Sequence, residues 1–192
     1  MEFHGLEKLN RRCFNFLLIS NHKSYLDVFV LGLFLNREVF FMAKKELFRY
    51  PIFKNIIKNL GAFSVDRDSS EGGALAIEKA VEILKRGNVV AMFPEGHMNC
   101  DDEKFLKPKT GFVRIAAAAN VGVVPCSIKY KSVFPEFIRF RRWLPFTKIC
   151  VRYGKEVKVF KMFKENFKEA KSSEIRDVTL KVWKNVEEQY NL

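Results

Sequence analysis

Short apolar segments alternate along the chain with longer amphipathic ones, and this alternation predicts the secondary structure. The apolar segments predict buried strands at residues 14–20, 39–43, 61–65, 89–93, 123–130 and 149–153. The amphipathic or mostly apolar longer segments predict helices at residues 25–35, 45–60 with an interruption at Pro51, 72–86, 112–120 and 172–190. Strands that alternate with helices and have β-branched apolar cores indicate an α/β fold with a mostly parallel central sheet flanked by helices.

The segment 72–86 gives the clearest helical pattern of the chain. One side of the predicted helix collects its apolar residues, which are Leu75, Ala76, Ala80, Ile83 and Leu84. Gly87 follows directly, in the position where a glycine commonly ends a helix.

Length and composition favour a single globular domain. The chain has 192 residues, of which 48% are hydrophobic and 29% charged, so it can bury a full core and does not resemble a disordered protein. We expect one domain over residues 1–192, with its sequence motifs in a core at about 14–128 and a basic, aromatic part at 129–192.

The cysteines and the N-terminus point to a reducing compartment. Cys13, Cys100, Cys126 and Cys150 form no C-x-x-C pair, and we expect them to be reduced thiols in a cytoplasmic protein. Residues 1–12 are polar and do not resemble a signal peptide, and no apolar segment approaches the roughly 18 residues that span a bilayer. The sequence therefore predicts a protein that does not cross a membrane.

The charge and the aromatic content suggest the partner. The net charge is +12, and Phe supplies 20 residues, against 5 Tyr and 2 Trp. A basic, Phe-rich chain fits an anionic partner with an apolar surface, and membrane lipid meets that description better than DNA.

Polar residues follow the first buried strand, at the end where α/β folds place their chemistry. Ser24 suits a helix N-cap, and Asp27 then falls at the position from which a carboxylate points back over the helix entrance, towards His22. A carboxylate on one imidazole nitrogen would leave the other nitrogen as a base. The alternative is a capped helix beside an incidental histidine.

Other strand ends also carry candidate site residues. Glu95 and Gly96 follow the strand at 89–93, although Pro-Glu-Gly also suits an ordinary turn. Arg67 ends the strand that Gly61 begins, and is suited to bidentate phosphate binding or to a surface ion pair. Lys44 follows the strand at 39–43, where a lysine is more often solvated.

In their order and spacing these segments resemble the glycerolipid acyltransferase family, which makes phosphatidic acid from lysophosphatidic acid. The resemblance covers residues 14–128. The matching residues are Asn21, His22 and Asp27 for N-H-x4-D, then Lys44, Gly61 and Arg67, then Phe93 to Gly96 for F-P-E-G, then Lys109 and Gly111 before a helix, and finally Val124 and Pro125 with Cys126 and Ser127 substituted.

The resemblance implies an enzyme of the 1-acylglycerol-3-phosphate O-acyltransferase type. His22 would take the proton of the acceptor hydroxyl, and Asp27 would orient the imidazole. Lys44 and Arg67 would hold the acceptor phosphate, assisted by the other substrate-binding residues, which are Gly61, Glu95, Gly96 and Lys109. The acyl donor would be acyl-CoA or acyl carrier protein, with no metal and no further cofactor.

Two departures from the family pattern bear on the acceptor and on the membrane. His97-Met98-Asn99 stands where the family has T-R-S, so an arginine associated with the acceptor phosphate is missing, and Lys109 or Arg114 would have to contribute. Other acceptors, such as glycerol 3-phosphate or a different lyso-lipid, therefore stay open, as does a non-catalytic lipid- or nucleic-acid-binding domain. The hydrophobic N-terminal segment that anchors many family members is also missing here.

The basic C-terminal part is the predicted membrane-binding surface. Residues 129–171 contain 13 Lys and Arg against 4 Asp and Glu, a difference of +9. Large apolar side chains are interleaved with these charges, namely Phe134, Phe137, Phe140, Trp143, Leu144, Phe146, Phe160 and Phe163. Such a surface suits peripheral binding to an anionic leaflet on the inner face of the membrane. The alternatives are a solvated charge run over core aromatics and, with no recognised motif, nucleic-acid binding.

Overall fold

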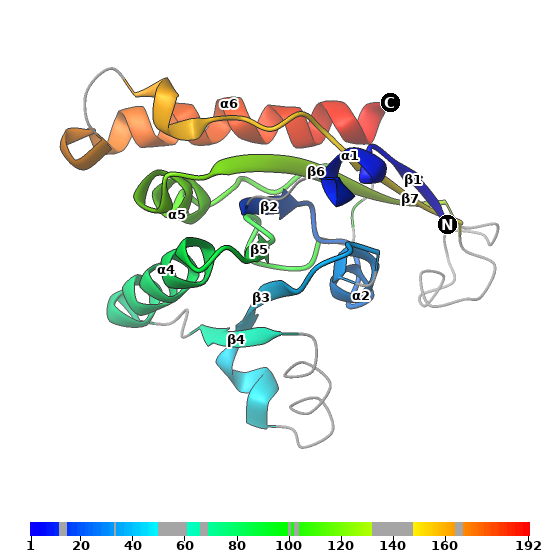
Figure 1. Ribbon diagram of the computed structural model, residues 1–192, viewed down its shortest axis with the longest axis horizontal. Helices are drawn as coiled ribbons and strands as arrows, with labels where there is room; N and C mark the ends of the chain where they lie inside the picture. The colour runs from blue at the N-terminus through cyan, green and yellow to red at the C-terminus, as the bar shows by residue number, and fades with distance from the viewer. Residues whose placement is uncertain are drawn as a thin grey trace.

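A computed structural model of the chain describes residues 1–11, 15–32, 34–49, 61–65, 69–99, 101, 104–131, 148–163 and 167–192. Its centre is a seven-stranded sheet with the strand order β1-β7-β6-β2-β5-β3-β4 (Figure 1). The strands are β1 (Glu2–His4), β2 (Phe16–Ser20), β3 (Val39–Lys44), β4 (Ala62–Val65), β5 (Val89–Met92), β6 (Gly122–Lys131) and β7 (Lys148–Tyr153).

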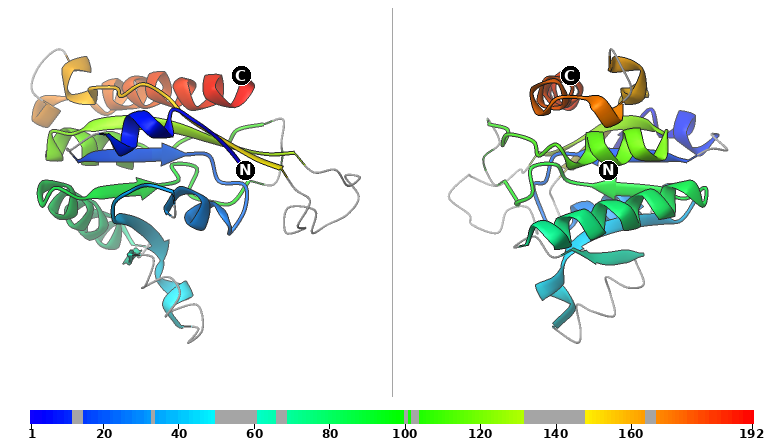
Figure 2. Two further views of the ribbon diagram at one scale, coloured as in Figure 1. Left: turned by 45° about the vertical axis from the view of Figure 1, so that its right-hand side comes forward. Right: turned by 90° about the vertical axis from the view of Figure 1, so that its left-hand side faces the viewer.

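Helices cover both faces of this sheet. The α-helices are α1 (Leu6–Asn10), α2 (Asp27–Gly32), α4 (Ser70–Lys85), α5 (Gly111–Ala119) and α6 (Ser172–Asn191). The 3₁₀ helices among the described residues are η1 (Lys45–Arg49), η3 (Val159–Met162) and η4 (Phe167–Glu169). Figure 2 shows α4, α5 and α6 on one side of the strands, with α1 and α2 on the other. The predicted α/β fold with a mostly parallel sheet is confirmed.

Strand direction decides where the site lies. β2 pairs in parallel with both β5 and β6, and β3 pairs in parallel with β4 and β5. Only β6 and β7, among the described strand pairs, run antiparallel. The carboxyl ends of β2, β3, β4 and β5 therefore meet at one edge, where the connecting loops are placed to form a crevice.

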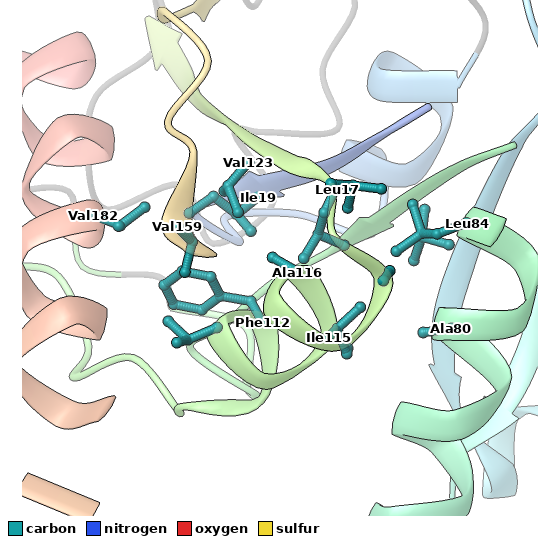
Figure 3. Packing of buried hydrophobic residues seen from close by; sticks show 14 of the residues in the cluster. Leu17, Ile19, Ala80, Leu84, Phe112, Ile115, Ala116, Val123, Val159 and Val182 are labelled. Atoms are coloured by element: carbon teal, nitrogen blue, oxygen red, sulfur yellow. The ribbon is translucent and has the colours of Figure 1, made fainter. Parts of the chain in front are cut away.

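The central strand β2 separates two hydrophobic clusters. All five of its residues are buried, because helices cover both faces of the sheet at this point. Leu17 and Ile19 pack towards α4, α5 and α6 (Figure 3). Phe16 and Leu18 pack on the opposite face, with residues of α1 and α2. This alternation follows from the two-residue period of a strand.

The helix α4 forms much as predicted, with one error. Its N-cap Ser69 accepts a hydrogen bond from the Gly72 amide at 3.0 Å, and Gly87 follows the helix with a φ of 89°. Leu75, however, is 58% exposed, whereas Ala76 is buried. Consecutive residues of a helix are turned by about 100°, so Leu75 lies outside the stripe that Ala76 shares with Ala80.

Other expectations were less accurate. The helix predicted at 25–35 is shorter, because α2 spans only Asp27–Gly32. The segment predicted as a helix at 45–60 begins as the 3₁₀ helix η1, and its part from residue 50 lies outside the described residues. β1 and α1 were not predicted at all, since three- and five-residue elements give too little periodicity to recognise.

The described residues include two of the four cysteines. Cys126 and Cys150 are free and buried, while Cys13 and Cys100 lie outside the described residues. Within the described ranges, every helix falls short of the length and apolar character that spanning a bilayer would require.

Candidate active site

Two loops meet at the carboxyl edge of the sheet and bring the predicted residues together. One loop joins β2 to α2 and carries His22, and the other follows β5 and carries Phe93 and Glu95. The His22 backbone amide donates to Glu95 Oε1 at 3.0 Å. The imidazole of His22 stacks on the ring of Phe93, with the ring centroids 4.1 Å apart and the planes inclined by 13°.

His22 and Asp27 form a hydrogen-bonded pair. The Nδ1 atom of His22 lies 2.8 Å from Oδ2 of Asp27, whose side chain is fully buried, while the His22 side chain is 18% exposed. A carboxylate beside Nδ1 favours the tautomer with the proton on Nδ1, which leaves the lone pair on Nε2. The pair thus presents a partly exposed base backed by a buried carboxylate.

Backbone amides hold the carboxylate of Asp27 in place. Its Oδ2 atom also accepts from the amides of Lys23 at 2.7 Å and Ser24 at 2.9 Å. The carboxylate therefore points back over the helix entrance, as predicted. The helix begins later than expected, at Asp27 itself, and the Ser24 hydroxyl accepts from the Leu26 amide at 3.2 Å.

Asn21, the residue before His22, pairs through its side-chain amide with the backbone of β6. β2 and β6 are paired up to Ser20 and Cys126. Beyond that point the Asn21 side chain replaces the missing strand partner: its Nδ2 donates to the Ile128 carbonyl at 2.9 Å, and its Oδ1 accepts from the Ile128 amide at 2.8 Å. This pairing satisfies buried backbone groups and fixes where the loop leaves the sheet.

Glu95 connects the two loops through backbone contacts. The side chain is 3% exposed. While Oε1 accepts from His22, Oε2 accepts from the Leu106 amide at 3.2 Å. The His22 carbonyl accepts in turn from the Asn99 amide at 2.7 Å. Through these contacts Glu95 holds the loop that carries His22 against the loop that follows β5, at the edge where the sequence placed it among the residues that shape the substrate site.

A groove of about 440 Å³ opens beside the pair, next to Phe93. Most of its walls are apolar, with contributions from Met42, Ala76, Ile77, Met92 and Ile115. Two cationic residues, Lys109 and Arg114, also line it. A cavity with apolar walls and a few charged groups suits an amphipathic anionic ligand.

Gly96 is needed where the groove meets Lys109. The glycine has a φ of 76°, and a Cβ atom there would lie 2.9 Å from Cε and 3.1 Å from Nζ of Lys109. Only glycine adopts this conformation readily and also admits the lysine side chain so close to the backbone. The structure therefore brings two predicted substrate-binding residues into one contact.

The remaining predicted residues are placed differently. Lys44 ends β3 at the carboxyl edge, while Arg67 lies outside the described residues. Gly61 precedes β4 and is at the other end of that strand from the crevice. Its φ is 69°, and a Cβ atom there would lie 2.9 Å from the Val39 carbonyl oxygen, so the structure gives it a backbone role. His97 is exposed.

Two contacts of the site had no recognisable signal in the sequence. The Tyr130 hydroxyl donates to Oδ1 of Asp27 at 2.6 Å, across 103 residues of chain. Lys23, which is 1% exposed, donates from Nζ to the Asp101 carbonyl and lies over the rings of Phe105 and Tyr190. Both contacts join segments far apart in sequence, so no local pattern reports them.

Cys126 of β6 is fully buried in the hydrophobic cluster that also contains Tyr130. Burial raises its pKa well above the ordinary value, a hydrogen bond from the Ser20 side chain opposes that rise, and the charge of Asp27 adds to it. The thiol therefore stays neutral and is unsuited to act as a nucleophile.

Comparison with known proteins connects this site to a family. The family model described as Acyltransferase matches residues 1–129. The 1-acyl-sn-glycerol-3-phosphate acyltransferase of Bacillus subtilis is 31% identical over 125 residues, which are 65% of this chain and 60% of the relative. The protein of the same name from Streptococcus pneumoniae is 32% identical over 125 residues, which are 64% of this chain and 45% of the relative.

A solved structure extends the similarity to nearly the whole chain. The crystal structure of the 1-acyl-sn-glycerophosphate acyltransferase PlsC from Thermotoga maritima aligns with a TM-score of 0.67 and 27% identity. The alignment covers 97% of this chain and 70% of that one. The chain therefore spans only part of the length of its curated relatives, 60% and 45% for the two named above.

Proposed function

We propose, since the chain belongs to the acyltransferase family, that it transfers a fatty acyl chain from an acyl thioester to the free hydroxyl of a lysophospholipid. The acceptor we propose is 1-acylglycerol 3-phosphate, which gives phosphatidic acid. The relatives in Bacillus subtilis and Streptococcus pneumoniae carry the name of this activity. The observation that carries the proposal is the hydrogen-bonded pair of His22 and Asp27 beside an apolar, cation-lined groove.

The pair supports direct transfer without a covalent enzyme intermediate. Nε2 of His22 takes the proton of the acceptor hydroxyl as its oxygen attacks the thioester carbonyl. Asp27 stabilises the imidazolium that forms. The tetrahedral intermediate then collapses, the carbon–sulfur bond breaks, and the imidazolium returns the proton to the departing thiolate. The donor is acyl-CoA or acyl carrier protein, and these steps call for no metal and no further cofactor.

The groove supports an amphipathic acceptor. Its apolar walls suit a fatty acyl chain, and Lys109 and Arg114 provide cations for a phosphate. Lys44 and Arg67 were predicted to hold the same phosphate, and this assignment remains part of the proposal. Met98 stands where the family has an arginine, so the groove cations would carry more of the phosphate binding in this chain.

The first test is an assay of thioester release and product formation with purified protein. His22→Ala should leave a folded protein whose turnover is reduced by at least about a hundredfold, because general-base catalysis contributes that much or more. Near-normal turnover would refute His22 as the base.

The second test is a panel of acceptors that includes 1-acylglycerol 3-phosphate, glycerol 3-phosphate and lyso-lipids with other head groups. The proposal predicts the highest kcat/KM for 1-acylglycerol 3-phosphate. Met98→Arg restores the family residue, and an improvement confined to 1-acylglycerol 3-phosphate would point to a different native acceptor. No transfer to any acceptor, with intact folding, would favour a non-catalytic lipid-binding domain.

We also propose that the basic part at 129–171 docks the protein on an anionic membrane. Its excess positive charge supports this, because charge brings a protein to the leaflet before apolar side chains enter it. Phe163, which the sequence placed on the membrane-binding surface, is instead buried. It packs against Phe167, with ring centroids 5.2 Å apart. Phe160 is half-buried, and the other apolar residues named for this surface lie outside the described residues.

Sedimentation with vesicles tests this docking. Binding should require anionic lipid, decrease as salt is raised, and weaken when Arg139, Arg141 and Arg142 are neutralised together. A protein that stays in the supernatant with anionic vesicles at low salt would refute the docking.

A further inference from the structure

We propose that Tyr130 is a positioning residue. Its hydroxyl holds the carboxylate of Asp27 in the orientation that His22 requires. This inference rests on the proposed function. Tyr130 lies on β6, 103 residues along the chain from Asp27. The contact that carries the inference is the 2.6 Å hydrogen bond from the Tyr130 hydroxyl to Asp27 Oδ1.

The two oxygens of the Asp27 carboxylate have different partners. His22 Nδ1 and the amides of Lys23 and Ser24 all approach Oδ2. Tyr130 approaches the other oxygen, Oδ1. A fully buried carboxylate oxygen without a donor is costly, so loss of this hydroxyl would favour any rotation that finds Oδ1 another partner. Such a rotation would move Oδ2 away from His22.

The ring of Tyr130 is held independently of its hydroxyl. Tyr130 is 7% exposed and belongs to the hydrophobic cluster that also contains Ile128, Ile149 and Tyr153. It pairs with Ile149 of β7 in the antiparallel ladder. Because packing fixes the ring, Tyr130→Phe removes one hydroxyl and leaves the surrounding side chains in place.

Tyr153 provides a matched control on the neighbouring strand. It is also 7% exposed and belongs to the same cluster. Its hydroxyl is buried and has no hydrogen-bond partner among the described residues. Tyr153→Phe therefore removes the same atom from the same cluster without touching Asp27, and we expect it to fold normally and to retain wild-type turnover.

The decisive measurement is steady-state kinetics on the full chain, with 1-acylglycerol 3-phosphate and an acyl-CoA. Tyr130→Phe should lower kcat by about tenfold, because a hydrogen bond to a charged group is lost and the base is less well oriented. The KM values of both substrates should change little, because the hydroxyl contacts the carboxylate and not the groove. Circular dichroism and thermal melting should show both phenylalanine variants folded.

A double-mutant cycle distinguishes positioning from a general effect on the structure. If Tyr130 acts through Asp27, its substitution should have almost no further effect on the residual activity of Asp27→Asn. A tenfold loss that persists in the Asp27→Asn background would overturn the inference, and so would equal losses in the two phenylalanine variants. The proposed function fails on a separate result, namely normal turnover of His22→Ala.

Should Tyr130→Phe melt far below the wild type, nuclear magnetic resonance of the His22 ring at low temperature gives a second readout. We expect its Nδ1 signal to move towards that of a ring without a carboxylate partner in Tyr130→Phe and to stay in place in Tyr153→Phe. An unmoved Nδ1 signal in Tyr130→Phe would overturn the inference.

Discussion

The pair of His22 and Asp27 and the groove beside it lie at the same edge of the sheet, yet they are built in opposite ways. Asp27 is fully buried, and both of its carboxylate oxygens have hydrogen-bond partners: His22 and two backbone amides at Oδ2, and the Tyr130 hydroxyl at Oδ1. The groove instead has apolar walls and two cations, Lys109 and Arg114, at its lining. Hydrogen bonds within the protein thus hold the pair in place, whereas the groove offers a ligand an apolar space with two cations.

This difference predicts opposite kinetic effects for substitutions in the two regions. Changes around the pair should lower kcat, because they disturb groups used in the transition state. Changes in the groove should raise the KM of the acceptor.

The largest effect among these predictions is expected from Asp27→Asn. It removes the charge opposite the imidazolium and turns one acceptor into a donor facing the amides of Lys23 and Ser24. We expect kcat to fall by about a hundredfold or more, with modest changes in KM. Thermal unfolding should also occur at a lower temperature, since a helix entrance loses its carboxylate. Wild-type kcat in a folded Asp27→Asn protein would contradict the contrast.

A smaller effect, confined to KM, is expected from Arg114→Ala in the groove. Loss of one charge-assisted partner of the acceptor phosphate is worth about 1.5–3 kcal/mol, which is about tenfold or more in the acceptor KM. The KM of the thioester and kcat should change little. The exposed Arg176 of α6 serves as the charge-matched control, and Arg176→Ala should alter neither constant. Equal effects of Arg114→Ala on both substrates would indicate a structural role.

Gly96→Ala should give a few-fold increase in the acceptor KM, because the new Cβ displaces Lys109. It should also cost about 1 kcal/mol of stability, since the residue has a positive φ. Gly87→Ala is the control: its φ is 89°, but a Cβ atom there meets nothing within 4 Å. Gly87→Ala should lose similar stability without any change in KM. If both variants change KM alike, the contact between Gly96 and Lys109 has no part in binding.

The smallest expected effect is on the reactivity of Cys126 towards thiol reagents. This reactivity shows whether solvent reaches the buried residues around His22 and Asp27. Burial raises the pKa of the Cys126 thiol, so the reactive thiolate is scarce at neutral pH and its population grows only as the pH rises. Peptide mapping after treatment with a thiol reagent should find Cys126 unmodified in native protein and modified after denaturation. Rapid labelling of native protein at neutral pH would show that this interior opens to solvent.

Local patterns in the sequence were sufficient for much of the fold. Strands such as β2 and β6 and helices such as α4 and α6 were predicted within a few residues, because continuous apolar runs and 3.6-residue periodicity are properties of the segments themselves. The strand β1 was missed and the helix α2 was predicted too long, because neighbours and not periodicity hold these short elements in place.

The contacts of the candidate site also divide into those that local sequence predicted and those that it did not. His22 and Asp27 are five residues apart, so one loop and one helix entrance determine their contact, and the motif revealed it. Glu95 was recognised as a site residue, but its contact with the His22 amide spans 73 residues and could not be foreseen. Gly61 was grouped with the substrate-binding residues, whereas the structure gives it a backbone role at the other end of β4.

The sequence by itself determined the α/β class, the family resemblance and the pair of His22 and Asp27, since each depends on the order and spacing of residues along the chain. Only the tertiary structure decided that Tyr130 bonds to Asp27, that Lys109 lies against Gly96, and that the groove opens beside Phe93. The contact between Tyr130 and Asp27, for example, joins segments that the parallel pairing of β2 and β6 brings together. Such pairing depends on the burial of the whole sheet between its helices, and no local segment encodes it.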